Sequence, residues 1–335
     1  MFITSNSDSS DTNQSPQRFG IEHIAQTESF EVGSWWWYIF AIPVMKIMEL
    51  ITVTKDMLGW LLNFEPRRTS LLFDREDAWT HDLIEYATEW RSLDDQYPYV
   101  NQPFRAFRES EKSKDILDAA WMKYMLHNQA VRNRFQIVFR LLKQNIAKRS
   151  EPKSEVRVLG LASGSGRDVI KAVAELRTEL GEMPPVQAFL IDHNRNAIEK
   201  ANELAGRYSL TNQIEAIRGV IRSDPAKLEQ KVSHFGPDIV YNIGFFDYKP
   251  DEVVIDMKQA IQRGLNDEGV LISGNIIPNP EMKFLPRVIN WAPMYHRTPE
   301  ELGTIMEKAG FPGGQIYVEP NKIFAVVEAL NSLPR

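Results

Sequence analysis

One stretch, residues 156–168, constrains the fold of this chain more than any other: Val-Arg-Val-Leu-Gly-Leu-Ala-Ser-Gly-Ser-Gly-Arg-Asp. Its first six residues are mostly apolar and predict a buried β-strand. A loop of small residues follows at 162–166, and from Asp168 the apolar residues recur at helical spacing. Gly164 and Gly166 tolerate positive φ and let a ligand approach the backbone. Because the N–H groups that open a helix attract anions, this unit predicts a site for a nucleotide-like cofactor.

Later segments strengthen this prediction. A second apolar strand is expected at 186–191, and Asp192 follows it, 26 positions after Gly166, where such folds hold a ribose by its hydroxyls. A weaker third strand is expected at 214–219. The cofactor could be a dinucleotide or S-adenosylmethionine, but Val169 stands where a dinucleotide fingerprint has a third glycine or alanine. Residues 315–318 and 323–328 predict a terminal β-hairpin.

With the expected strands at 238–244 and 269–275, these segments resemble the class I S-adenosylmethionine-dependent methyltransferases over residues 155–330. The resemblance implies an α/β fold: a doubly wound, mostly parallel, Rossmann-like sheet of seven strands that ends in an antiparallel hairpin. It also implies S-adenosyl-L-methionine as cofactor. The chain departs from the family at three positions. An acidic residue is usual at Gly160, a glycine at Ala162 and an acidic residue near Val220. The implied cofactor-binding residues are Gly160, Leu161, Ala162, Ser163, Gly164, Gly166, Asp192, His193, Val220, Asn242 and Gly244.

The segment 242–251 follows the fourth expected strand, at the sheet edge where α/β proteins bind ligands, and should border the transferred methyl group. Methyl transfer needs alignment, an unprotonated nucleophile and exclusion of water. A hydroxyl or amine acceptor would need a base, whereas a carboxylate acceptor would need none. In the alternative interpretation Asp247 caps a turn and the phenylalanines belong to the core. The candidate catalytic residues are Asp247, Tyr248 and His296, and the candidate substrate residues are Phe245, Phe246, Asn275, Trp291, Tyr295 and Arg297.

A narrower resemblance concerns the acceptor. Residues 244–248, 274–275, 291–295 and 297–298 resemble a bacterial methyltransferase group that makes 3-hydroxypalmitic acid methyl ester, the "extracellular factor" signal. In this chain Phe245 and Lys249 replace two leucines of that group's pattern, and His296 separates Tyr295 from Arg297. This resemblance implies a small carboxylic or fatty acid-like acceptor. Arg297, or an arginine from 132–140, could hold its acidic end.

The N-terminal half predicts two further regions. Residues 1–33 are polar and expected to be disordered, apart from a short ordered piece near residues 21–24. Residues 34–150 are expected to be helical, including a basic helix over 113–147 whose charges form a solvated face or hold an acidic substrate. The uncharged run in 34–64 ends at Lys46, too soon for a transmembrane helix of about 20 residues. Segment 34–64 is therefore expected either to pack on the catalytic domain, 151–335, or to lie at a membrane interface as a lid or anchor.

Composition excludes several classes of function. A net charge of −6 argues against a general nucleic-acid binder. The chain has no cysteine, which excludes disulfides and thiolate chemistry, and it shows no clustered ligand motif, so no metal is expected. No secretory signal is recognised, so a cytoplasmic location is expected, with peripheral membrane contact through 35–64 as an addition. Two rival functions remain: an NAD-dependent oxidoreductase, and a non-catalytic methyltransferase-like protein that docks on a membrane.

Overall fold

The computed structural model describes residues 18–25, 30–33, 37–61, 125–150, 155–221, 224–288 and 293–332. Three predicted parts of the chain lie outside these ranges. They are residues 62–124 of the expected helical region, residues 151–154 at the start of the expected catalytic domain, and the candidate substrate residue Trp291. The domain boundaries therefore remain predictions.

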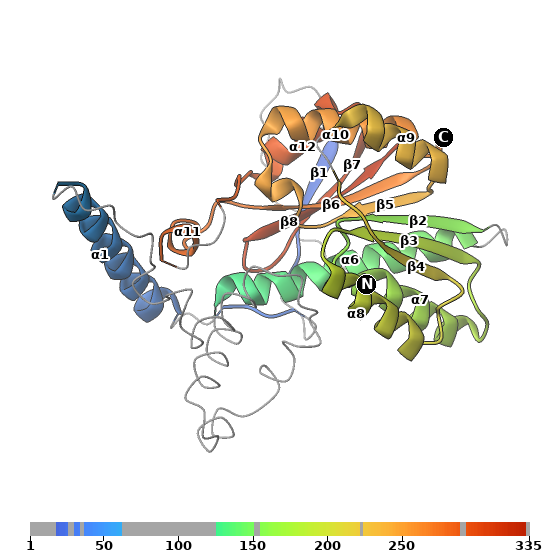
Figure 1. Ribbon diagram of the computed structural model, residues 1–335, viewed down its shortest axis with the longest axis horizontal. Helices are drawn as coiled ribbons and strands as arrows, with labels where there is room; N and C mark the ends of the chain where they lie inside the picture. The colour runs from blue at the N-terminus through green and yellow to red at the C-terminus, as the bar shows by residue number, and fades with distance from the viewer. Residues whose placement is uncertain are drawn as a thin grey trace, which may run out of the picture.

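An eight-stranded sheet forms the centre of the protein, with the order β1-β7-β8-β6-β5-β2-β3-β4 (Figure 1). All neighbouring strands run parallel except β8, which is antiparallel to both β6 and β7. This confirms the predicted α/β class, the mostly parallel sheet and the terminal hairpin. The strands are β1 (Phe19–His23), β2 (Val156–Leu161), β3 (Val186–Asp192), β4 (Ile214–Arg218), β5 (Ile239–Asn242), β6 (Val270–Ile276), β7 (Gly313–Val318) and β8 (Phe324–Leu330).

Strand β1 corrects one expectation, because the sheet has eight strands instead of seven. The strand contains the first part of the ordered piece that was expected near residues 21–24. β1 pairs in parallel with β7 at the sheet edge, and the Ile24 N–H continues the pairing by donating to the Val318 carbonyl at 2.9 Å. Phe19 is buried against Gly314, where an added Cβ would approach its ring to 2.9 Å. Residues 30–33 also pack on the protein, since the Glu31 carboxylate receives two N–H groups of buried Arg132.

Helices cover both faces of the sheet. On one face lie α6 (Leu126–Ser150), α7 (Arg167–Leu180) and α8 (Arg195–Arg207); on the other lie α9 (Pro225–Phe235), α10 (Asp251–Gly264) and α12 (Pro299–Lys308) (Figure 1). A capping box opens α12: the Glu301 N–H donates to Thr298 Oγ1, and the Glu301 carboxylate accepts from the Thr298 N–H. Because helices cover both faces of the sheet, its strands carry apolar side chains on both faces, and one hydrophobic core forms on each side.

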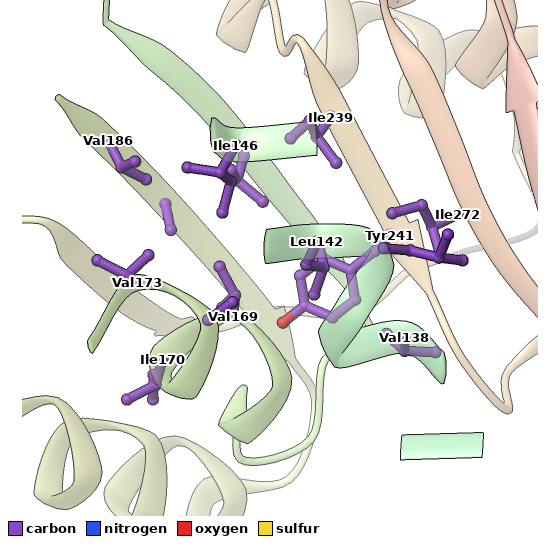
Figure 2. Close-up of a cluster of buried hydrophobic side chains, with 14 of the residues drawn as sticks. Val138, Leu142, Ile146, Val169, Ile170, Val173, Val186, Ile239, Tyr241 and Ile272 are labelled. Carbon is purple, nitrogen blue, oxygen red and sulfur yellow. The ribbon is translucent and has the colours of Figure 1, made fainter. Parts of the chain in front are cut away.

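The hydrophobic core between the sheet and helices α6 and α7 adjoins the predicted cofactor loop. Figure 2 shows Val138 and Leu142 of α6 together with Val169 of α7 and Tyr241 of β5 in this cluster. Val169 is fully buried here, so the residue that departs from a dinucleotide fingerprint has a packing role in this chain.

Two helices lie away from the sheet layers. The short α11 (Phe284–Val288) packs with α1 (Ile42–Leu61), which projects from the side of the molecule and follows a π-helical turn, η1 (Trp37–Ala41) (Figure 1). Within the described ranges no helix is both long and apolar enough to cross a bilayer.

Candidate active site

The loop between β2 and α7 has the backbone shape that its small residues allow. Ala162, Gly164 and Gly166 have φ values of 51°, 56° and 60°, in the left-handed region. The Ser163 N–H donates to the Ile191 carbonyl at 3.1 Å, which anchors the loop to the end of β3. Gly166 is the residue before α7, and no side chain in the described parts of the chain caps that helix start. The loop therefore presents backbone at the carboxyl edge of the sheet.

Asp192, at the end of β3, is the carboxylate next to this loop. Its Oδ2 accepts the Gly164 N–H at 2.8 Å and its Oδ1 accepts the Asn194 N–H at 2.9 Å. The neighbouring His193 is exposed, with its Nδ1 3.3 Å from the same Oδ1. Asp192 is thus a structural acceptor for the loop as well as a candidate ligand for ribose hydroxyls.

Replacing Asp192 with alanine is expected to weaken cofactor binding by about 1–3 kcal/mol, because the loop loses its acceptor and the ligand a charge-assisted hydrogen bond. Titration calorimetry with S-adenosylmethionine measures this difference. Glu215→Ala, which removes an exposed carboxylate from the neighbouring strand β4, is the matched control. Equal affinities of both variants would remove Asp192 from the site.

Two buried polar atoms near the loop have no hydrogen-bond partner in the described structure: Ser163 Oγ and Asn242 Oδ1. The amide of Asn242 is fixed, since its Nδ2 donates to the Leu161 carbonyl at 2.5 Å. Unpartnered buried acceptors are costly unless a ligand satisfies them. An ammonium or hydroxyl group is the kind of ligand that would do so, and the polar groups of S-adenosylmethionine fit this donor and acceptor set.

Packing explains one departure from the methyltransferase pattern. An added Cβ at Gly160 would lie 2.9 Å from Leu190 Cδ2 and from the ring of Tyr241, so no acidic side chain fits there. The Tyr241 hydroxyl is buried without a partner, and burial raises the pKa of that phenol well above its ordinary value. At another departure from the pattern, Val220 is exposed and lines a surface pocket. The other lining residues are Ile221, Asp224, Lys227, Leu228 and Lys231.

The 3-10 turn η2 (Phe246–Tyr248) follows β5 on the other side of the loop. Asp247 is buried there, and its Oδ1 accepts the Ile276 N–H at 2.8 Å while its carbonyl accepts the Tyr295 N–H at 2.6 Å. Burial raises the pKa of Asp247, and nearby Arg134 opposes that shift. Tyr248 is exposed, as is Tyr295. Asp247 therefore joins η2, the end of β6 and the segment 293–297.

Arg297 has a structural position that its sequence context did not reveal. It is only 3% exposed and donates to Asp251 Oδ1 at 2.8 Å, to Asn275 Oδ1 at 2.7 Å and to the carbonyls of Phe246 and Lys249. These bonds hold η2 against β6. Protein atoms engage its guanidinium, and they also engage the Asn275 side chain, so both residues have a structural role here.

Arg134 is the arginine of the basic helix that reaches the site. Its guanidinium lies 4.3 Å from the centre of the Phe324 ring, and an added Cβ at Gly244 would lie 3.7 Å from Nη1. Among the described residues no hydrogen bond or salt bridge engages this guanidinium. Burial lowers the pKa of Arg134, opposed by Asp247 and Asp168. A cation without a direct partner therefore faces the carboxyl end of β5, beside β6.

Two histidines lie in this region, His127 close to Arg134 and His296 close to His127. His127, in the first turn of α6, packs its ring edge against Phe324, and its pKa falls to about 3 because of burial and the charge of Arg134. His296 Nδ1 lies 3.1 Å from the Met294 carbonyl, so Nδ1 carries the hydrogen and Nε2 has the lone pair. Nε2 is buried without a partner, and burial lowers the pKa of His296. His296 is therefore a neutral imidazole with a free acceptor nitrogen.

A buried lysine under η2 was not foreseen from the sequence. Lys258 of α10 is 1% exposed, donates from Nζ to Ser273 Oγ at 2.7 Å and lies 4.6 Å from the centre of the Phe246 ring. Burial lowers its pKa to about 7. Lysine side chains usually extend to solvent, so a lysine within an amphipathic helix gives no sequence signal of burial.

Comparisons with known proteins agree with this fold. A family model described as "Putative methyltransferase" matches residues 91–331. The chain belongs to this methyltransferase family. No curated protein sequence matches it.

Solved structures with a similar fold show low sequence identity. A Bordetella parapertussis structure, described as a possible exported protein, is 18% identical, covers 85% of this chain and 96% of its own, and has a TM-score of 0.57. The magnesium protoporphyrin IX methyltransferase of Synechocystis, solved with bound SAH, is 13% identical, with coverages of 71% and 94% and a TM-score of 0.44. Human N-acetylserotonin methyltransferase, in complex with SAM, is 14% identical, with coverages of 72% and 66% and a TM-score of 0.39.

No group of three or more candidate metal ligands is found in the described part of this methyltransferase. Independence from metals remains a prediction. Its basis is that the sulfonium of the expected cofactor is already an activated leaving group.

Proposed function

We propose that this methyltransferase uses S-adenosyl-L-methionine to methylate the carboxylate of a small, apolar, fatty acid-like acceptor. The observation that carries the acceptor class is Arg134, a half-buried guanidinium with no hydrogen-bonded partner among the described residues, placed next to η2. A guanidinium binds a carboxylate through two parallel hydrogen bonds. Such a pair would fix the acceptor oxygen beside the cofactor loop.

The cofactor half of the proposal rests on the loop at 162–166 and Asp192. When bound, the cofactor supplies a methyl group on a positively charged sulfur. The backbone of the loop, Ser163 Oγ and Asn242 Oδ1 would receive its methionine part, and Asp192 its ribose hydroxyls. The half-buried ring of Phe245 packs edge to face on the buried ring of Phe246 at 5.4 Å and would provide apolar surface that excludes water near the transferred methyl.

The acceptor half needs no proton transfer. A carboxylic acid is ionised at neutral pH, so its oxygen is already a nucleophile once Arg134 has aligned it. Phe245, which is half-buried, would offer apolar surface for the chain of the acceptor. The resemblance to the 3-hydroxypalmitic acid methyl ester group is consistent with this acceptor class.

A second candidate is a hydroxyl acceptor, and His296 favours it. Its buried Nε2 carries a lone pair and has no partner in the described structure, which suits a general base. Asp247 is less suited, because Oδ1 already accepts the Ile276 N–H. In this alternative Arg134 would stabilise the developing oxyanion instead of holding a carboxylate.

The rival functions proposed from sequence have less support. An NAD-dependent oxidoreductase would need close helix–strand contact at position 169, where a valine fills the core. A non-catalytic role would leave the buried Nε2 of His296 and the guanidinium of Arg134 without a function.

The test is an assay of fatty and hydroxy-fatty acids of increasing length with isotopically labelled methyl donor. Burial of each CH₂ contributes about 0.8 kcal/mol, so affinity should rise about fourfold for each carbon added until the pocket is filled. The product should be a base-labile methyl ester. A flat response across lengths, or transfer only to polar amines, would contradict the proposed acceptor.

A further inference from the structure

Helix α1 is apolar on its outer face as well as on the face that packs on the protein. The face that packs on the protein includes Glu49 and Thr52, which are 6% and 7% exposed, together with Met45. Glu49 accepts from Lys46 Nζ at 2.8 Å, and Thr52 Oγ1 donates to the Met48 carbonyl at 2.9 Å. The polar groups on this face are thus satisfied locally, while Met45 and Met48 pack in an apolar cluster with α11.

The outer face of α1 and η1 carries eight large apolar side chains that are between 40% and 70% exposed. At about 100° per residue they cover roughly half of the helix circumference, interrupted only by Pro43, Lys46 and Thr54. A contiguous apolar surface of this kind marks an interaction site in a folded protein. Its members are Ile39, Phe40, Val44, Ile47, Leu50, Ile51, Val53 and Met57, here called the α1 apolar face.

Among the described side chains beside the α1 apolar face, the exposed charges are basic. Lys283 precedes α11 and Arg287 lies in its last turn, four residues apart, and both are exposed. Lys46 also donates to the Pro280 carbonyl at 3.5 Å, so this end of α1 lies close to the segment leading into α11. Among the described side chains of α1 and α11 the sole acid is Glu49, which is buried and paired. This charge distribution suits an anionic surface.

The helix cannot reach across a bilayer, because no described helix meets the length and hydropathy that a span requires. It can lie in the plane of the interface, with apolar side chains among acyl chains and basic ones at the headgroups. Figure 1 shows α1 projecting beyond the sheet and its covering helices, which leaves its outer side accessible.

We propose that the α1 apolar face docks this protein, parallel to the surface, on membranes that contain anionic lipids. A second copy of the chain is the competing occupant, and the experiment separates the two. The proposal is independent of the proposed function, since a protein with no methyl transfer activity could dock in the same way.

The test is flotation of the full chain with vesicles of phosphatidylcholine alone or mixed with phosphatidylglycerol. The wild-type protein should float with the mixed vesicles and much less with the zwitterionic ones. The double variant Ile47→Glu/Leu50→Glu should lose at least tenfold in vesicle affinity. Lys283→Glu/Arg287→Glu should lose the preference for anionic lipid.

The matched control is Leu180→Glu, which adds one charge at an apolar residue that is 53% exposed on α7, away from α1. It should bind vesicles as the wild type does, and all variants should keep the wild-type circular dichroism melting temperature because the substituted side chains are exposed. Light scattering gives the oligomeric state. Absence of flotation, equal binding by Ile47→Glu/Leu50→Glu, or a dimer that this variant dissociates while vesicles stay unbound would each overturn the proposal.

Discussion

Replacing Gly166 with valine is expected to abolish binding of S-adenosylmethionine. Gly166 has φ of 60°, a conformation that is strained for a β-branched residue by about 1–2 kcal/mol. Its added Cβ would also overlap Leu190 Cδ1 in the core below the loop. The valine side chain would therefore push the loop away from β3 and from Asp192.

Gly181→Val is the matched control for this substitution. Gly181 lies at the other end of α7 with φ of 70°, and an added Cβ there meets nothing within 4 Å. Both variants carry the same backbone strain, and only Gly166→Val crowds the loop. Calorimetry should show no cofactor binding for Gly166→Val and near wild-type affinity for Gly181→Val. Wild-type affinity in both would show that the loop does not hold the cofactor.

Arg134→Met is expected to lower kcat/KM for carboxylic acceptors by about 100-fold, because hydrogen bonds to a charged partner contribute about 1.5–3 kcal/mol each. Arg134→Lys should recover only part of this loss, since an ammonium cannot make the two parallel bonds. Cofactor affinity should remain unchanged in both variants. The measurement is steady-state transfer of a labelled methyl group to a medium-chain acid.

The control for Arg134 comes from the same helix. Arg140 lies two turns further along α6, where its guanidinium stacks on Phe30, 4.8 Å from the ring centre, outside the site. Arg140→Met removes the same charge and should leave kcat/KM within about twofold of wild type. An equal loss of kcat/KM in the two variants would show that Arg134 contributes only through the net charge of the protein. An active Arg134→Met enzyme combined with an inactive His296→Gln enzyme would favour the hydroxyl acceptor.

The sequence predicted the parts of the fold that local patterns encode. Three short-range signals correspond to observed elements. The apolar run at 156–161 is β2, the apolar run that ends at Asp192 is β3, and the terminal hairpin is β7 with β8. Strand β1 was not predicted as a strand, because its five residues contain few apolar side chains and its partner β7 lies almost at the other end of the chain. Pairing over such separation leaves no mark in local periodicity.

The site was harder to predict for a related reason. In sequence, nothing distinguishes the six basic residues at 132–149 as candidates for binding the acceptor. The packing of α6 against β6 and β8 is what places Arg134 at the site. Arg132 is buried with Glu31, a residue of the segment expected to be disordered. Arg297 resembled a substrate ligand in its motif, but backbone carbonyls that come together only in the folded chain occupy its donors.

The most direct test of this account uses S-adenosylmethionine whose transferable methyl group carries deuterium, incubated with the purified protein and a mixture of fatty acids, hydroxy-fatty acids, alcohols and amines. Mass spectrometry then identifies which compound gains the label and at which atom. The account predicts a labelled methyl ester of an apolar acid, formed by the wild type and Arg140→Met and nearly absent with Arg134→Met. Label only on a hydroxyl or amine, or equal ester formation by Arg134→Met, would contradict it.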